Sequence, residues 1–400
     1  MKRIERTTYL NQLKDLQDRQ IIKVITGVRR CGKSTLMEIY QDYLRNNGVQ
    51  ENQIIVINFE DFDNFELRDS QKLYQYVKDR ILDDNMTYVF FDEIQLVDRF
   101  PDVVNSLFLK KNVDLYLTGS NAYMLSSEIA TLLSGRYVEI PLLPLSFKEY
   151  ISFDGDTSNL QRKYSEYIEF SSFPYILDLE KNIKIIDDYL HGIYSTIVLK
   201  DIITRKKIND VMLLESVIKF VFDNIGNVLS SKKIADTLTS SGRKTDVKTI
   251  EKYINAMLES FVIYQANRYN IKGKQFLKTM EKYYVVDLGL RAMLLGRRSY
   301  DVGHILENIV YLELLRRGKE VYIGKVDDLE VDFVTIDRDT IAYYQVAATV
   351  RDENTLKREL LSLQKIKDQY PKVLLTLDED PDADYNGIKR VNVLNWLLSE

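Results

Sequence analysis

The sequence predicts an α/β protein with a doubly wound parallel sheet, and three observations support this prediction. The apolar run Ile21–Ile25 leads directly into the glycine-rich stretch "TGVRRCGKST", after which the pattern is typical of a helix. Further apolar runs, "ENQIIVINFEDF", "TYVFFDEIQ" and "VDLYLTGSNA", end in polar residues. A helical pattern, "FPDVVNSLFLKK", lies between the last two runs. Strands that alternate with helices pack as a parallel sheet, and such sheets bind ligands where their strands end.

The composition limits the classes of protein to consider. A chain of 400 residues exceeds one usual hydrophobic core, so we expect several domains. A net charge of −5 argues against a protein that coats nucleic acid along its whole surface. One cysteine excludes an internal disulfide, and 2 histidines argue against a zinc site. No apolar run is long enough to cross a bilayer, and "MKRIERTTYL" lacks the apolar core of a signal peptide, so we expect a cytoplasmic protein without a membrane partner.

The glycine-rich stretch has the spacing of a phosphate-binding loop, G-x-x-x-x-G-K-[ST]. Glycines let the backbone wrap closely enough for its N–H groups to point at phosphate oxygens, and the following helix adds its positive end. We expect Lys33 to contact the β- and γ-phosphates and Ser34 to be a Mg²⁺ ligand. An ordinary glycine turn is the alternative, which the flanking strand and helix disfavour. The expected nucleotide-binding residues are Gly27, Arg30, Cys31, Gly32, Lys33, Ser34 and Thr35.

Two acidic residues, Asp92 and Glu93, end the apolar run at Thr87–Phe91. Four consecutive apolar residues indicate a strand buried on both faces. Beside a phosphate loop, Asp92 is expected to hold Mg²⁺ and Glu93 to polarise the water that attacks the γ-phosphate. A plain solvent-facing turn is the alternative for this acidic pair.

Two further residues complete the expected catalytic set of Lys33, Glu93, Asn121 and Arg136. Asn121 follows the run at Val113–Gly119, where its amide could orient the attacking water or instead cap the next helix. Arg136 precedes a short apolar strand. It fits either an arginine finger for the γ-phosphate of a neighbouring subunit, which implies a homo-oligomer, or a surface salt bridge.

These motifs resemble the AAA superfamily of ATPases. The chain is more closely similar to bacterial and archaeal ATP-binding proteins in which a small AAA core is fused to a C-terminal domain of unknown function. The resemblance implies that Lys33 and Ser34 form the first phosphate motif, Asp92 and Glu93 the second, and Asn121 the polar sensor. The matching segments are "GVRRCGKST", "FFDEIQ", "LTGSNA", "LLSGRYVEIPLLPLSFKEY", "GIYSTIVLKDIITRKKI", "YYVVDLGLRAML", "ENIVYLELLRRGKEVYIGK" and "EVDFV".

Four domains are expected along the chain. Residues 1–144 form the AAA-type P-loop core, and residues 145–205 form a helical lid segment in which Asp201 and Arg205 can pair along a helix. Residues 206–295 read as three helices and a strand pair, which predicts a winged helix-turn-helix. Residues 296–400 are expected to form an α/β domain that resembles the restriction-endonuclease fold.

The winged helix has two interpretations. Its third helix, starting near Thr245 or Asp246, could enter a DNA major groove, with basic neighbours on phosphates. The basic residues are Arg243, Lys244 and Lys248, with Lys272, Lys274 and Lys278 in the expected wing loop. On the other interpretation the module only relays nucleotide state, and Glu251 and Glu259 on the same helix favour that view.

The last hundred residues match the nuclease outline incompletely. Glu307, Asp332 and Gln345 occupy the acidic and polar positions, but Ala347 stands where the resemblance places a catalytic lysine. A methyl group cannot donate a proton or stabilise negative charge, so we expect a scaffold without nuclease activity. Metal binding by Glu307 and Asp332 stays open.

The leading hypothesis is therefore a Mg²⁺-dependent ATPase whose nucleotide state repositions its winged-helix and nuclease-like modules, with DNA as an expected partner. A nucleotide-gated switch with slow or no hydrolysis, binding a protein or DNA, is the alternative. A metal-dependent nuclease is a weaker alternative.

Overall fold

A computed structural model describes residues 3–82, 85–120, 133, 135–297, 301–337 and 340–399, without the side chains of residues 199, 200, 278 and 279. Its internal contacts divide the chain into two compact units. The first comprises residues 1–144 with 259–261, and the second comprises residues 145–258 with 262–400. No described helix is both long enough and apolar enough to cross a bilayer.

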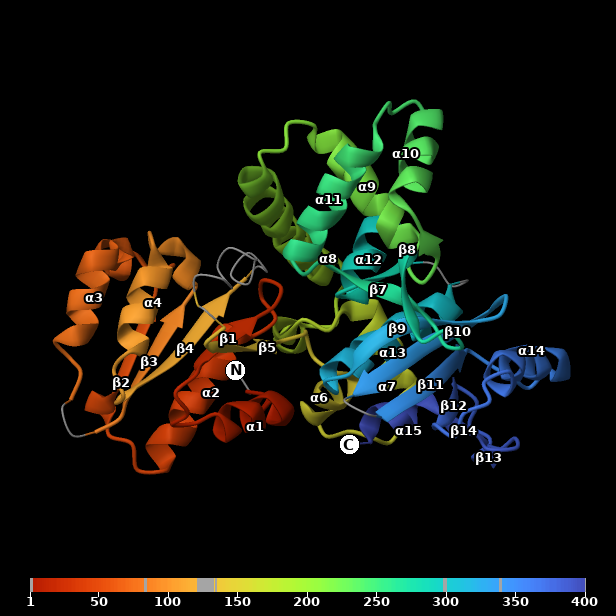
Figure 1. Ribbon diagram of the computed structural model, residues 1–400, viewed down its shortest axis with the longest axis horizontal. Helices are drawn as coiled ribbons and strands as arrows, with labels where there is room; N and C mark the ends of the chain where they lie inside the picture. Colours follow the sequence, from red (N-terminus) through yellow and green to blue (C-terminus); the bar gives the residue numbers. More distant parts are fainter. Residues whose placement is uncertain are drawn as a thin grey trace. The chain divides into compact units, whose positions relative to one another are not determined.

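The first unit is built on a five-stranded parallel sheet with the strand order β2-β3-β4-β1-β5 (Figure 1). The parallel α/β sheet expected from the sequence is confirmed. Strand β4 lies between β1 and β3, so the phosphate loop after β1 and the acidic pair after β3 are one strand apart at the same edge. The strands are β1 Ile22–Thr26, β2 Ile54–Asn58, β3 Thr87–Asp92, β4 Val113–Gly119 and β5 Tyr137–Pro141.

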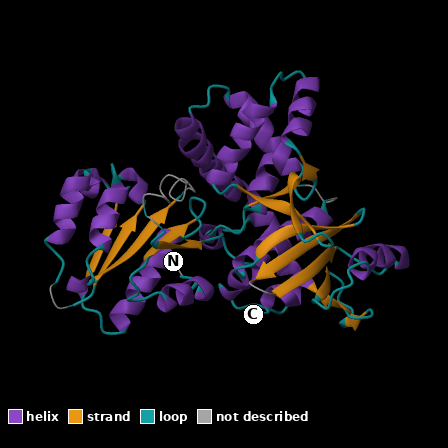
Figure 2. Ribbon diagram, in the orientation of Figure 1, coloured by secondary structure: helices purple, strands orange, loops and turns teal. Residues whose placement is uncertain are grey.

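Helices cover both faces of this sheet (Figure 2). Successive residues of a buried strand point to opposite faces, and β3 shows this clearly. Phe91 packs in the core that contains α3 and α4, while Phe90 stacks on Tyr116 at 4.7 Å between ring centroids and contacts Tyr40 of α2. The helices are α1 Thr7–Asp15, α2 Lys33–Asn46, α3 Ser70–Lys78 and α4 Phe100–Phe108, with one-turn or short 3₁₀ segments at Glu51–Gln53, Phe62–Arg68 and Ile94–Leu96.

The second unit begins with a helical segment. Its helices are α6 Phe147–Ser152, α7 Leu160–Phe170, α8 Ile183–Thr196, a π-helix Ile197–Thr204, α9 Val211–Asp223, α10 Ser231–Ser240, α11 Val247–Glu259, α12 Leu288–Leu295, α13 Val302–Arg316, α14 Glu353–Gln364 and α15 Val393–Leu398, with a 3₁₀ segment at Pro174–Asp178. The Arg205 guanidinium lies 3.4 Å from Asp201 across the end of the π-helix, so the expected pair is present. Polar side chains cap α10 and α11: Ser230 accepts from the Lys233 N–H, and Asp246 accepts from the Thr249 N–H.

A nine-stranded mixed sheet forms the core of the second unit, in the order β13-β14-β12-β11-β10-β9-β7-β8-β6. The strands are β6 Val228–Leu229, β7 Ile263–Asn270, β8 Gln275–Val285, β9 Glu320–Val326, β10 Leu329–Asp337, β11 Thr340–Ala347, β12 Lys372–Thr376, β13 Ala383–Asp384 and β14 Ile388–Asn392. Strand β7 pairs with β8 on one side and with β9 on the other. The hairpin is therefore built into the large sheet.

The hairpin corrects one sequence expectation. A basic loop was expected between Asn270 and Glu281, but the structure has a tight turn at residues 271–274 and strand from Gln275 onward. The difference arises because β7 supplies a partner strand. Arg268 pairs with Leu277 and Asn270 pairs with Gln275, so "QFLKTM" forms the first part of β8. A bulge between Ala266 and Arg268 shifts the register and lets both strands extend.

Candidate functional site

The phosphate loop joins β1 to α2 through residues 27–32, and its backbone requires glycine at both ends. Gly27 has φ 147° and Gly32 has φ 102°, in the region that glycine favours. A Cβ atom on Gly27 would lie 2.2 Å from the carbonyl oxygen of Leu142, which follows β5. Helix α2 starts at Lys33, immediately after the loop, so its positive end faces the ligand side.

The side chain of Lys33 folds back onto the loop. Its Nζ donates to the carbonyl oxygens of Gly27 at 3.0 Å and Val28 at 3.1 Å. The same nitrogen lies 4.0 Å from Oε1 of Glu93. The expected phosphate-binding cation and the expected catalytic carboxylate are thus brought together at the carboxyl edge of the sheet.

Asp92 and Ser34, the two expected Mg²⁺ ligands, lie close enough for the Ser34 hydroxyl to act on the Asp92 carboxylate. Burial raises the pKa of Asp92 above its usual value, and hydrogen bonds from Ser34 and Thr118 oppose that shift. Hydroxyl and carboxylate oxygens form the donor set that Mg²⁺ prefers, so these two residues fit the ion.

Thr118, at the end of β4, is a site residue that was not predicted. Its hydroxyl donates to Oδ1 of Asp92 and accepts the backbone N–H of Glu93 at 2.9 Å. One hydroxyl therefore orients both members of the acidic pair. The available signal was a polar residue at the end of a buried strand.

Glu93 has a constrained geometry. Its backbone lies in the left-handed region at φ 56°, which is uncommon for a residue with a side chain and stores strain of order 1 kcal/mol. The N–H bond to Thr118 holds this conformation. Only 8% of the residue is exposed, and Gln95 Nε2 donates to its Oε2.

Arg6 supports the phosphate loop by a hydrogen bond to the loop backbone, a role that the sequence did not predict. Its guanidinium donates to the carbonyl oxygens of Cys31 at 3.2 Å and Leu143 at 2.6 Å. The side chain of Cys31 is 0% exposed, so it packs inward, and burial raises the pKa of its thiol. A contact of Cys31 with nucleotide, as expected from the sequence, would therefore have to come from its backbone. Arg30 and Thr35, also expected at the nucleotide, have exposed side chains.

Two expected catalytic residues remain, Asn121 and Arg136. Asn121 is outside the described residues. Arg136 is exposed, directly precedes β5, and its guanidinium lies 5.5 Å from the centroid of the Phe108 ring. Because β5 runs parallel to β1 with Tyr137 opposite Ile22, Arg136 lies at the amino edge of the sheet, away from the phosphate loop of its own chain.

The second unit gathers a separate polar cluster, which we call the Lys282 cluster: Lys282, His304, Glu307, Glu330, Asp332 and Gln345. These residues line a pocket of about 700 Å³. Lys282 Nζ lies 2.9 Å from Glu307 Oε1 and 2.7 Å from Glu330 Oε1. Sequence reasoning missed Lys282, although a charged residue within the apolar strand "KYYVVD" is a signal. Ala347 is buried in the neighbouring core and contributes no chemistry.

Each acid in this cluster has a different environment. Asp332 Oδ2 accepts from the Val346 N–H at 2.8 Å, and burial followed by the Glu307 charge raises the pKa of Asp332 well above its usual value. Burial raises the pKa of Glu307 as well. The Lys282 charge and the hydrogen bonds that Glu307 accepts lower the pKa by more, so the pKa of Glu307 lies below its usual value. No group of three or more His, Cys, Asp or Glu side chains in the described part of the chain is arranged to hold a metal ion.

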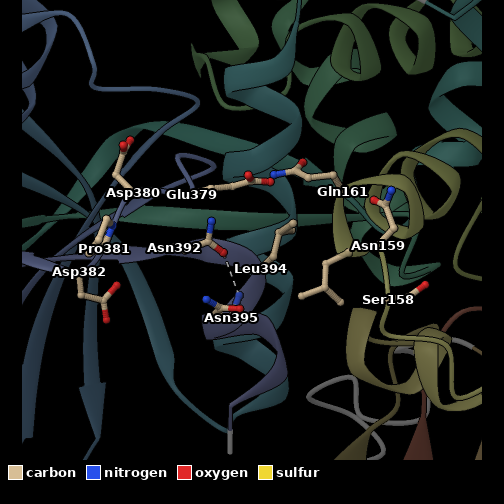
Figure 3. Close-up of a pocket in the computed structure, with 11 residues that line it drawn as sticks. Ser158, Asn159, Gln161, Glu379, Asp380, Pro381, Asp382, Asn392, Leu394 and Asn395 are labelled. Carbon is tan, nitrogen blue, oxygen red and sulfur yellow. Dashed lines mark hydrogen bonds between the residues drawn. The ribbon is translucent and has the colours of Figure 1, made fainter.

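A second pocket in this unit, of about 630 Å³, is polar (Figure 3). Figure 3 shows Gln161 and Glu379 pointing toward each other across it. Its amides are occupied by structural bonds: Asn159 caps α7, and Asn392 caps α15 and donates to the Asp378 carbonyl at 2.9 Å. Asn159 and Asn392 in this pocket therefore stabilise the N-terminal ends of α7 and α15.

The third helix of the expected winged helix, α11, presents a mixed exposed face. Lys248, Glu251, Lys252 and Asn255 are exposed along it. The wing lysine Lys272 is bound to Asp327, with Nζ 2.5 Å from Oδ1, so it is less available to a partner than the sequence suggested. Lys278 is among the residues whose side chains are outside the description.

The fold and the loop geometry define an AAA-type P-loop ATPase domain, and comparison with known proteins agrees. Residues 19–151 match the family model described as an AAA domain, and residues 161–301 match a domain of unknown function, DUF8612. The chain belongs to the same family as a protein of Haemophilus influenzae described as uncharacterized, which is 41% identical over 99% of this chain and 98% of that protein.

Two further similarities are more distant. A Methanocaldococcus jannaschii protein, also described as uncharacterized, is 32% identical over 87% of this chain and 79% of that protein. A Walker-type ATPase of Pyrococcus abyssi has a solved structure that covers 73% of this chain and 96% of its own, at 13% identity and a TM-score of 0.45.

Proposed function

We propose that this protein binds Mg·ATP at the carboxyl edge of the first unit's sheet and hydrolyses it. The observation that carries the proposal is the approach of Lys33, from the phosphate-loop motif, to Glu93 of the acidic pair, with 4.0 Å between Nζ and Oε1. This contact brings the two motifs within reach of one triphosphate. A glycine turn without function would not need a buried carboxylate beside it.

The side chains have separate roles in this proposal. Lys33 exchanges the carbonyl oxygens of Gly27 and Val28 for oxygens of the β- and γ-phosphates. Ser34 and Asp92 would hold Mg²⁺, which when bound neutralises charge on the phosphate oxygens. Glu93 polarises a water, whose oxygen forms a bond to the γ-phosphorus as the bond to the bridging oxygen breaks and ADP leaves with the electron pair. Glu93 accepts the proton of that water.

Two variants test the proposal. Lys33→Ala should weaken ATP binding at least about tenfold, because the β- and γ-phosphates lose the ammonium group that balances their negative charge. Glu93→Gln should bind ATP within about threefold of wild type but hydrolyse it about 100-fold more slowly. Calorimetry measures binding and phosphate release measures turnover, with circular dichroism as the check on folding. Wild-type turnover in Glu93→Gln, or no heat with ATP for folded wild type, would contradict the proposal.

The alternative is a nucleotide-gated switch with slow or no hydrolysis. Two contacts favour a site that stays inactive until a partner acts. Lys33 is hydrogen bonded to the carbonyl oxygens of its own loop, and Glu93 is held by Gln95. Single-turnover and steady-state phosphate release, with and without duplex DNA, separate the two. Tight ATP retention with negligible turnover under both conditions supports the switch, and turnover stimulated by DNA supports a motor.

We propose duplex DNA as the partner of the second unit. The order α9, β6, α10, α11, β7, β8 is that of a winged helix-turn-helix, which supports the proposal. Four cations lie on or just before α11, and no salt bridge to them is found within the described residues. These are Arg243, Lys244, Lys248 and Lys252.

Salt dependence tests the DNA proposal. Replacing Lys248 and Lys252 by alanine should reduce the slope of log K against log salt by about two, since each phosphate contact contributes roughly 0.9. Fluorescence anisotropy with a labelled duplex measures this slope. Lys357→Ala is the control, because Lys357 is exposed on α14 and paired with Glu353. An unchanged slope in the double variant would contradict the proposal.

The place of Arg136 at the opposite sheet edge means that its proposed finger role requires a second copy of the chain. ATPase activity that rises with protein concentration, and falls in Arg136→Ala, would support it. A nuclease has less support, because Lys282 is paired with Glu307, one of the two carboxylates that a metal would need.

A further inference from the structure

Gln95 lies two residues after Glu93, in the one-turn 3₁₀ segment Ile94–Leu96 that follows β3. Its amide nitrogen donates to Oε2 of Glu93. The other oxygen of that carboxylate, Oε1, lies 4.0 Å from the Lys33 ammonium. Glu93 is therefore held from both ends, by a cation on one oxygen and by an amide on the other.

The orientation of the Gln95 amide follows from chemistry. An ionised carboxylate only accepts hydrogen bonds, so the nitrogen of the amide must face Glu93 and its carbonyl oxygen must face away. That carbonyl oxygen is buried and has no hydrogen-bond partner among the described residues. Buried acceptors without a partner are uncommon in folded proteins and call for an explanation.

Packing alone does not explain this glutamine. A methionine or leucine of similar volume would fill the same space without leaving a buried oxygen unpaired. Among the described residues, the one favourable polar contact of this side chain is its bond to Glu93. The presence of an amide at position 95 is therefore explained by the hydrogen bond that it donates to the Glu93 carboxylate.

Ser120 shows the same feature on the neighbouring strand end. Its hydroxyl is buried without a partner among the described residues, and it lies two residues after Thr118, which holds both Asp92 and Glu93. Two polar atoms without a partner among the described residues thus follow β3, which carries the acidic pair, and its neighbour β4.

We propose that Gln95 is a positioning residue for hydrolysis: it fixes the Glu93 carboxylate and so sets the rate of water activation. The inference rests on the proposed ATPase function. When Lys33 turns to the phosphates, Glu93 loses its cation, and the Gln95 amide is the side-chain donor that keeps its direction. Nucleotide binding involves Lys33, Ser34 and the loop backbone, so Gln95 contributes to kcat and not to affinity.

Gln95→Ala should lower kcat about tenfold while KM for ATP stays within about threefold of wild type. Gln75→Ala is the matched control, because Gln75 makes the same amide-to-carboxylate bond, to Asp79 at 2.5 Å, on the exposed face of α3. The control should retain wild-type kcat. A fall in KM and kcat together, or wild-type kcat in Gln95→Ala, would overturn the inference.

A double-mutant cycle separates positioning from a general loss of structure. In a Glu93→Gln background, Gln95→Ala should have almost no further effect on kcat, because the two residues act as one unit. A further tenfold loss in that background would overturn the inference.

Gln95→Glu supplies a second readout. Ionised, it repels Glu93 and cannot donate, but protonated, it has the shape and the donor of glutamine. Its kcat relative to wild type should therefore recover as the pH falls. No recovery at any pH where the protein is folded would count against the inference. If wild type itself shows no ATP turnover, the ATPase proposal fails first, which is a distinguishable result.

Discussion

The ammonium of Lys282, on β8, and the carboxylate of Glu307, on α13, form a buried ion pair with 2.9 Å between Nζ and Oε1. The residues are 25 positions apart, and both side chains are less than a tenth exposed. Glu330 on β10 shares the same ammonium, and Tyr284 donates to the same Glu307 oxygen at 2.6 Å. Lys282 therefore connects the β7–β8 hairpin to helix α13 and to strand β10.

Breaking the pair from one side should strongly destabilise the protein. Lys282→Met leaves Glu307 buried without its counter-ion, which costs about 3–5 kcal/mol of unfolding free energy. Urea denaturation measures the change. Lys272→Met is the control, because the Lys272–Asp327 pair is exposed and such pairs contribute about 0–1 kcal/mol. Adding Glu307→Gln to Lys282→Met should restore part of the loss; equal stability of both lysine variants would show that the pair is unimportant.

The pKa of His304 should lie above the usual histidine value. The Glu307 carboxylate, whose Oε2 lies 3.8 Å from Nδ1, raises the pKa of His304 from 6.5. A raised pKa favours the charged form in the folded state, so this stabilisation is complete below pH 6.5 and is lost as the pH rises through the folded-state pKa. Proton NMR measures the titration, and His191→Gln assigns the signals because the chain has 2 histidines. A pKa at or below 6.5 would contradict the expectation.

Cys31 should react slowly with alkylating agents. It is 0% exposed inside the phosphate loop, and burial raises the pKa of its thiol, so little thiolate is present at neutral pH. The time course of N-ethylmaleimide labelling, followed by mass spectrometry, should be far slower in native protein than in urea, and ATP should slow it further. Native labelling as fast as in urea, or unaffected by ATP, would count against a nucleotide held on this loop.

Gly27→Ala should disrupt nucleotide binding. Its Cβ would lie 2.2 Å from the Leu142 carbonyl oxygen, and that backbone cannot move without shifting β5. Gly192→Ala in helix α8 is the control, since its Cβ meets nothing within 4 Å and alanine favours a helix by about 1 kcal/mol. We expect ATP affinity to fall at least tenfold in the first variant and to stay unchanged in the second. Unchanged affinity in Gly27→Ala would show that the loop adapts.

Much of the first unit could be predicted because its signals are local. A glycine at positive φ, a lysine opening a helix and an acidic pair after four apolar residues each lie within ten residues of chain. Parallel packing then requires the strands to end at one edge, so Lys33 and Glu93 were expected together. The β7–β8 hairpin was harder to predict, because "QFLKTM" reads as a basic loop until β7 supplies a partner strand.

The sequence by itself determined the phosphate loop, the acidic pair and the α/β class, since each depends on spacing within a short segment. Only the tertiary structure decided that Thr118 links Asp92 to Glu93, that Arg6 supports the loop, and that Lys282 is the counter-ion of the buried Glu307. These contacts join residues 25 or more positions apart. Their partners are chosen by sheet order and burial, because a buried charge must be paired with whatever group the fold brings beside it.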